Sequence, residues 1–135
     1  MTSTPVRMSV VLDSTDPHGI AGFWEQALGY RRAADLGTFL VLAPDEPGGG
    51  PVVVLQRVEQ EPAGRRMHLD LHPADAGVHV RLLEGLGATR VGPPVTELQA
   101  TLGVWWQVMT DPQGNTFCVV ADPPQPPPDP TKEST

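Results

Sequence analysis

The chain has 135 residues, a formal net charge of -7, 39% hydrophobic residues, 16 prolines and one cysteine, Cys118. This length predicts one domain with a real core. A lone cysteine forms no internal disulfide, and no amino-terminal run combines basic residues with an apolar stretch of signal-peptide length, so we expect a cytoplasmic protein. The acidic charge and the lack of an apolar run of about 18 residues argue against nucleic acid and membranes. We therefore expect a small-molecule ligand or substrate as the partner.

The first half of the chain predicts a strand, a helix and three more strands. Residues 7–13 alternate between two kinds of side chain, which is typical of a strand with unlike faces. The helix begins after Asp16, a good N-cap, and ends at Gly29. Its apolar residues follow at helical spacing, and we expect two of them, Phe23 and Trp24, to face the core. The three strands are predicted at 30–34, 38–43 and 52–58.

The second half repeats this order, which favours an internal duplication. A strand is predicted at 67–72, followed by a helix from about residue 74. Its apolar residues Val78, Leu82 and Leu86 stand at i, i+4 and i+8. Further strands are predicted at 89–91, 105–110 and 116–120, with a turn at 111–115 and a long irregular connection before residue 105. The chain is thus predicted to hold two βαβββ modules, about 5–58 and about 66–121.

The C-terminal residues differ in composition from the rest. Six of the 16 prolines fall between Pro123 and Pro130. The segment has no apolar periodicity, so we expect residues 122–135 to form an extended or disordered tail outside a domain at 1–121. A solvated terminus is favoured over a ligand for a proline-recognition module.

Strand parity places polar residues on the sheet faces that the helices do not cover. In the first module these faces carry Ser9, Val11 and Asp13. In the second module they carry His68, Asp70 and His72. Pairing of the modules would turn both faces toward a shared cleft. A polar sheet face is either exposed to solvent or part of a functional site, and strand parity alone does not distinguish these two alternatives. Trp105 and Trp106 point to opposite faces, so one belongs to the core and the other faces the cleft or a dimer interface.

Three segments in order resemble the vicinal oxygen chelate superfamily, the glyoxalase, bleomycin-resistance and extradiol dioxygenase group. They are VVLDSTDPHGIAGFWEQALGY, RRMHLDLHPADAGVHVRLLEGLGATRV and DPQGNTFCVV. The chain is most similar to the small single-domain glyoxalase-like proteins of that group. The resemblance implies an α+β fold in which two paired βαβββ modules form an open, cleft-bearing barrel. It also implies a homodimer, with a small organic ligand or a divalent metal inside the cleft.

The resemblance also implies four metal-ligand positions, and only one holds a clear ligand. Ser9 and His68 occupy the equivalent positions of the two first strands, Gln56 is the nearest candidate on a fourth strand, and Cys118 stands where metal-binding members often have Glu. His68 and His72 lie about 13 Å apart along a strand and cannot share a metal. The best set that the residues offer is His68, Asp70 and Cys118. We therefore expect no cofactor, with a divalent metal as the alternative.

These residues lead to two main hypotheses and a third. The first is a domain that binds a small organic molecule in its cleft, either to sequester it or to perform metal-independent acid-base chemistry through His68 and Asp70. The remaining candidate ligand contacts are Ser9, Asp13, Gln56, His72, Trp105, Trp106 and Cys118. The second hypothesis is a metal-dependent lyase, isomerase or dioxygenase of the glyoxalase kind, with a non-standard ligand set. The third is an interaction domain that uses the proline-rich tail.

Overall fold

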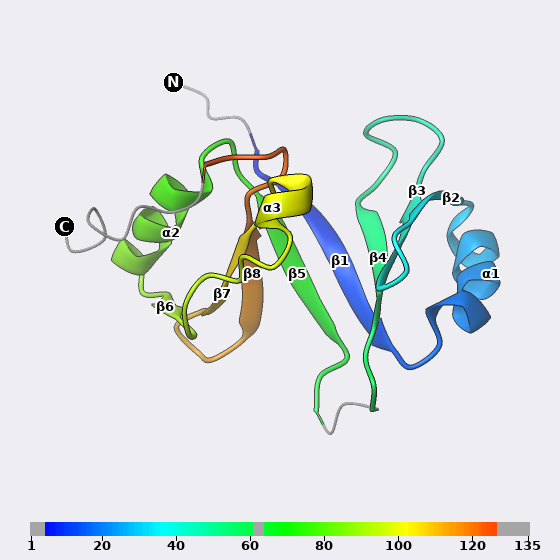
Figure 1. The fold of residues 1–135 in the computed structure, drawn as a ribbon, viewed down its shortest axis with the longest axis horizontal. Coiled ribbons are helices and arrows are strands. Elements are labelled where there is room, and N and C mark those ends of the chain that lie inside the picture. The colour runs from blue at the N-terminus through cyan, green and yellow to red at the C-terminus, as the bar shows by residue number, and fades with distance from the viewer. Residues whose placement is uncertain (1–4, 61–63, 127–135) are drawn as a thin grey trace. The chain divides into compact units, whose positions relative to one another are not determined.

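A computed structural model describes residues 5–60 and 64–126 (Figure 1), and its class is mixed α+β. The elements of these residues are β1 (Arg7–Ser14), α1 (Pro17–Leu28), β2 (Arg31–Asp35), β3 (Phe39–Ala43), β4 (Val52–Arg57), β5 (Met67–His72), α2 (Ala76–Gly85), β6 (Thr89–Arg90), α3 (Gln99–Leu102), β7 (Trp106–Thr110) and β8 (Thr116–Val120). The repeated strand and helix order is confirmed. One addition is α3, a single turn inside the connection that was predicted to be irregular.

The strands are hydrogen bonded in the order β2-β3-β4-β1-β5-β8-β7-β6. The two ends of this order do not pair among the described strands, so the sheet is open, as predicted. The chain divides into two compact units, one of residues 8–69 and one of residues 70–126 with residues 5–7. The division falls inside β5, between Leu69 and Asp70. The shared cleft of the two modules stays a prediction.

The first unit packs α1 on its sheet. The Asp16 side chain accepts a hydrogen bond from the Gly19 amide at 3.1 Å, and Gly29 ends the helix with a φ of 71°. Ala21 is fully buried, whereas Phe23 is 66% exposed, so the prediction that Phe23 faces the core is wrong. At 100° per residue Phe23 lies about 200° around the helix from Ala21, and the small alanine takes the contact face. The core cluster consists of Ala21, Leu40, Leu42, Val53 and Leu55, with Val10, Leu12, Ile20, Trp24 and Tyr30 packed against it.

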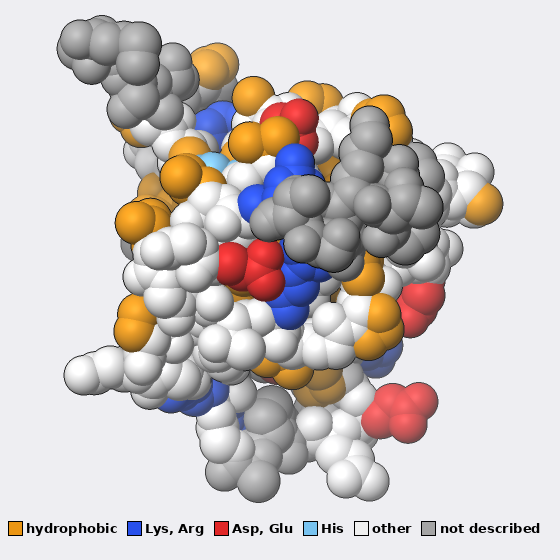
Figure 2. Space-filling model, turned by 90° about the vertical axis from the view of Figure 1, so that its left-hand side faces the viewer, with side chains coloured by type: hydrophobic (Ala, Val, Ile, Leu, Met, Phe, Trp, Pro, Cys, Tyr) orange, Lys and Arg blue, Asp and Glu red, His pale blue; other side chains and the backbone are white. Residues whose placement is uncertain are grey.

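The second unit packs α2 on its sheet in the same way. The Asp75 side chain accepts a hydrogen bond from the Val78 amide at 3.0 Å. The core cluster consists of Ala76, Val80, Trp105, Met109, Val119 and Ala121, with Leu83, Ala88 and Phe117 against it. The apolar residues that predicted this helix lie on another face, because Val78, Leu82 and Leu86 are 52%, 55% and 70% exposed. Figure 2 views the side that carries α2 and shows hydrophobic side chains among charged ones.

The predicted tail begins with residues that are hydrogen bonded to the second unit. The Gln125 side chain accepts a hydrogen bond from the Ala76 amide at 2.8 Å, and the Pro126 carbonyl accepts one from the Trp105 indole at 2.9 Å. Residues 125 and 126 of the predicted tail are therefore in contact with the second unit. The remainder of that predicted tail, 127–135, lies outside the described residues. No helix in the described part of the chain is long and apolar enough to span a membrane.

Candidate functional site

The first unit carries its polar residues on the sheet face that α1 does not cover. In the register of β1 with β4, Ser9 lies beside Val52 and Asp13 beside Gln56. Because neighbours in register share a face, Ser9, Asp13 and Gln56 lie on one side of this sheet. Ser9 is only 6% exposed, and Asp13 and Gln56 are half-buried. This is the face that parity predicted for Ser9 and Asp13.

Asp13 lies within electrostatic range of His68, which belongs to the same unit. Burial raises the pKa of the Asp13 carboxyl above its usual value, and the positive charge of His68 acts in the opposite direction. The backbone of Asp13 is fixed by a hydrogen bond from its amide to the Arg66 carbonyl at 2.8 Å. Since Arg66 directly precedes the strand that bears His68, this hydrogen bond brings β1 and the start of β5 together.

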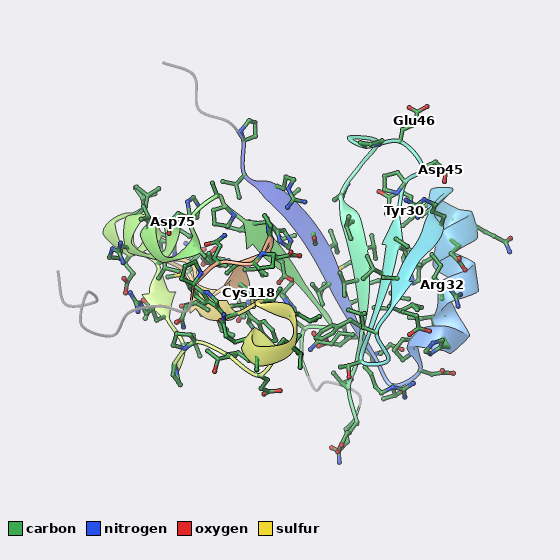
Figure 3. All side chains as sticks on the ribbon, turned by 45° about the horizontal axis from the view of Figure 1, so that its top comes forward. Tyr30, Arg32, Asp45, Glu46, Asp75 and Cys118 are labelled. Carbon is green, nitrogen blue, oxygen red and sulfur yellow. The ribbon has the colours of Figure 1, made fainter. Side chains whose placement is uncertain are left out.

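In the second unit Asp70 and Cys118 form a hydrogen-bonded pair. Cys118 is buried on β8, at the position shown in Figure 3, and Asp70 is half-buried on β5. Burial raises the pKa of the Cys118 thiol to about 12, and both the charge of Asp70 and the hydrogen bond between the two side chains add to this. Without a metal the sulfur is therefore a neutral thiol at physiological pH. It serves as a hydrogen-bond donor to the carboxylate rather than as a nucleophile.

His72 lies at the far end of β5 in a different environment. Burial lowers the pKa of His72, whereas the charge of Asp70 and a hydrogen bond to the Asp122 backbone act to raise it. The Arg7 guanidinium also donates to the Asp122 carbonyl, at 3.5 Å. The sequence did not indicate this association of Arg7 and Asp122 with His72, because Asp122 follows the last strand and was assigned to the tail.

The two adjacent tryptophans have distinct places. Trp105 is 2% exposed and belongs to the core cluster, so it is a core residue and not a free ring for ligand stacking. Trp106 points to the opposite face of β7. In the register of β7 with β8, Trp106 lies beside Val120, and the next pair on that face joins Val108 to Cys118. Trp106 therefore shares a sheet face with Cys118.

Three side chains form a group that could hold a metal. One potential ligand atom from each of His68, Asp70 and Cys118 lies within 4.8 Å of the other two. Donors bound to one Zn²⁺ at about 2.0–2.3 Å lie about 3.3–3.8 Å from one another in tetrahedral geometry, so the ligand atoms would have to approach one another by about 1 Å. A nitrogen, an oxygen and a sulfur donor suit a borderline metal such as zinc. The residues thus fit a three-ligand site with one position left for a ligand or water. His72 is not in the group, as the strand spacing predicted.

The model of a family described as "Glyoxalase-like domain" matches residues 9–120. No curated protein matches the chain. Among solved structures, a glyoxalase/bleomycin resistance protein/dioxygenase superfamily member from Vibrio splendidus 12B01 is 19% identical with a TM-score of 0.57, and the match covers 87% of this chain and 100% of that one.

A second similar structure is a variant of Streptomyces coelicolor methylmalonyl-CoA epimerase in complex with 2-nitronate-propionyl-CoA. It is 12% identical with a TM-score of 0.62, and the match covers 87% of this chain and 98% of that one. At these identities the likeness shows the fold alone. The family model spans most of the chain, including both units and the strands that carry His68, Asp70 and Cys118. The chain therefore belongs to the glyoxalase-like domain family of the vicinal oxygen chelate superfamily.

Proposed function

We propose that this glyoxalase-like domain binds a small organic molecule on the polar sheet face that carries His68 and Asp70, either to sequester it or to move a proton on it. The observation that supports this most is the grouping of His68, Asp70 and Cys118 on partly buried strands. A carboxylate beside an imidazole in a partly desolvated place is a typical arrangement for hydrogen bonding to a ligand and for acid-base chemistry.

The side chains would divide the work according to their chemistry. Asp70 accepts a hydrogen bond or a proton from the bound molecule. His68 donates a proton to that molecule or accepts one from it. Cys118 is a positioning residue, because its thiol donates to the Asp70 carboxylate and holds it in place. Trp106, on the same face as Cys118, offers an aromatic surface for stacking. Ser9, Asp13, Gln56 and His72 remain proposed ligand contacts.

A second candidate function is metal-dependent chemistry of the glyoxalase kind. It is favoured by the donor set of His68, Asp70 and Cys118, whose ligand atoms lie within 4.8 Å of one another. When bound, a divalent ion would polarise a ligand oxygen or lower the pKa of a bound water. Whether the reaction is that of a lyase, an isomerase or a dioxygenase, these three residues of the chain would be the metal ligands.

Two measurements separate the candidates. Purified protein is first analysed for bound metal by mass spectrometry, before and after chelator treatment. Chelated protein is then screened by thermal shift against metabolites and natural-product antibiotics, since a ligand at 100 times its Kd adds about 2.7 kcal/mol of apparent stability. The variants are His68→Ala and, as the matched control, His79→Ala on α2.

The organic-ligand proposal expects chelator-insensitive binding that His68→Ala weakens by about tenfold to a hundredfold, while His79→Ala leaves it unchanged. Stoichiometric metal that chelator removes and His68→Ala cannot bind would support the second candidate instead. Absence of both ligand and metal binding would contradict both. We also propose a homodimer, because the resemblance to the superfamily implies one.

A further inference from the structure

The C-terminal residues 122–126, here called the strap, run along a connection within the second unit. This connection, residues 91–105, joins β6 to β7 and includes the single turn α3. The sequence predicted it as irregular surface or a lid. Its first part is held by β7, because the Gln107 side chain donates to the Gly92 carbonyl at 3.0 Å. Val95 and Trp106 also exchange backbone hydrogen bonds at 2.8 and 3.2 Å.

The later part of the connection is held by the strap. The backbone amide of Gln125 donates to the Gly103 carbonyl at 3.4 Å. The side-chain nitrogen of Gln99 donates to the backbone carbonyl of Gln125 at 3.5 Å. Gly103 has a φ of 70° and approaches Pro124 so closely that a Cβ there would lie 2.9 Å from the proline Cβ. Among the described residues, the hydrogen bonds that join 99–103 to another segment run to Gln125.

The strap is itself anchored on the body of the unit by a side chain suited to that position. The Gln125 side-chain oxygen accepts from the Ala76 amide at 2.8 Å, in the first turn of α2, and its nitrogen donates to the Pro73 carbonyl at 3.3 Å. One residue further on, the Pro126 carbonyl accepts from the indole of the buried Trp105 at 2.9 Å. An amide side chain can satisfy a donor and an acceptor at once. Gln125 thus joins α2 to the connection.

We propose that the strap fastens the connection between β6 and β7 to the second unit, so that its attachment determines whether the segment 99–103 lies closed on that unit. The connection borders Trp106 through its bridge with Val95, and Trp106 shares a sheet face with Cys118. The strap therefore acts on the same connection that borders Trp106 through Val95.

Hydrogen exchange of backbone amides tests this on the purified, ligand-free protein. The variants are a truncation after Ala121, which removes the strap, and Gln125→Ala, which removes its anchor. The controls are a truncation after Pro126, which keeps the strap, and Gln113→Ala, which changes an exposed glutamine in the 111–115 turn. The amides of Leu102 and Gly103 are the reporters, because they donate to Leu98 and Gln99 only while the turn is formed.

Removing the strap or its anchor is expected to speed exchange over 99–103 by about tenfold or more, with exchange in β3 of the first unit unchanged. Both controls are expected to stay within about twofold of the full chain. Unchanged exchange over 99–103 in Gln125→Ala and the truncation after Ala121 would overturn the proposal. Equal acceleration in β3 would overturn it too, because the strap would then support the whole fold. If the truncation after Ala121 does not fold, Gln125→Ala alone decides between these results.

Discussion

The burial of the Cys118 thiol, together with its pairing with Asp70, makes a quantitative prediction about stability at alkaline pH. The folded protein holds the pKa of Cys118 at about 12, against an ordinary value of 9.0 in the unfolded chain. The fold therefore favours the protonated thiol. This contribution to the free energy of unfolding is fully present below pH 9 and is lost progressively as pH rises from 9 toward 12.

The size of the effect follows from the two pKa values. At pH 10 most unfolded chains carry a thiolate, whereas almost all folded chains keep the thiol. Linkage then gives a loss of about 1.4 kcal/mol between pH 8 and pH 10, from 1.36 kcal/mol per pKa unit. The contributions of all other titrating groups cancel when wild type is compared with a variant at position 118.

The assay is urea unfolding of chelator-treated wild type, Cys118→Ala and Cys118→Ser at pH 8, 9 and 10. Both substitutions remove the titrating group, and serine keeps a donor for the Asp70 carboxylate. Each variant has its own constant cost from the altered packing around position 118. Relative to either variant, wild type is expected to lose about 1.4 kcal/mol from pH 8 to pH 10.

Two outcomes bear directly on the chemistry of the site. A difference between wild type and the variants that stays constant from pH 8 to pH 10 in chelated protein would refute the raised pKa of the buried Cys118 thiol. The same experiment with added zinc tests the metal candidate. A bound ion stabilises the thiolate, so the alkaline loss would vanish and the cysteine would release its proton below neutral pH.

Three further predictions concern the fold. Asp16→Ala and Asp75→Ala each remove an N-cap hydrogen bond and are expected to lower the free energy of unfolding by about 1 kcal/mol in urea titrations; losses below about 0.3 kcal/mol would show that the caps are replaceable. Gly103→Ala is expected to lower the melting temperature more than Gly29→Ala, since both glycines have a φ near 70° but only Gly103 faces Pro124, and equal losses would contradict that contact. Light scattering is expected to give twice the 14.5 kDa chain mass, whereas a concentration-independent value of 14.5 kDa would contradict the homodimer.

The sequence predicted the elements well because local signals mark their ends. The predicted cap Asp16, the terminating Gly29 and the alternation in β1 and β5 all correspond to features of the structure. It failed on which helix face is buried. Both helices have apolar residues on more than one face, and periodicity predicts a helix without selecting among those faces. Small residues such as Ala21 and Ala76 take the contact positions because they let the helix approach the sheet.

The candidate site was predictable only as far as strand parity extends. Parity places His68 and Asp70 on one side of β5, and it requires Trp105 and Trp106 to face opposite ways. Which tryptophan is buried depends on the register between β7 and β8. Asp111 supports the turn between these strands, because its carboxylate accepts hydrogen bonds from the amides of Gln113 and Asn115 at 2.8 and 2.9 Å. That register places Trp106 on the face of Cys118 and leaves Trp105 in the core.

The strap could not be predicted from composition, for a physical reason that applies to other proline-rich segments. Proline lacks an amide donor and disfavours both helix and central strand, so a run of prolines is typical of a tail. Composition says nothing of the residues between the prolines. Here one glutamine, Gln125, places an acceptor and a donor on α2 and its preceding loop, and the carbonyl of Pro126 accepts from a buried indole. A proline-rich segment can thus bind its own domain through carbonyls and interspersed amides, and its boundary is set by those contacts.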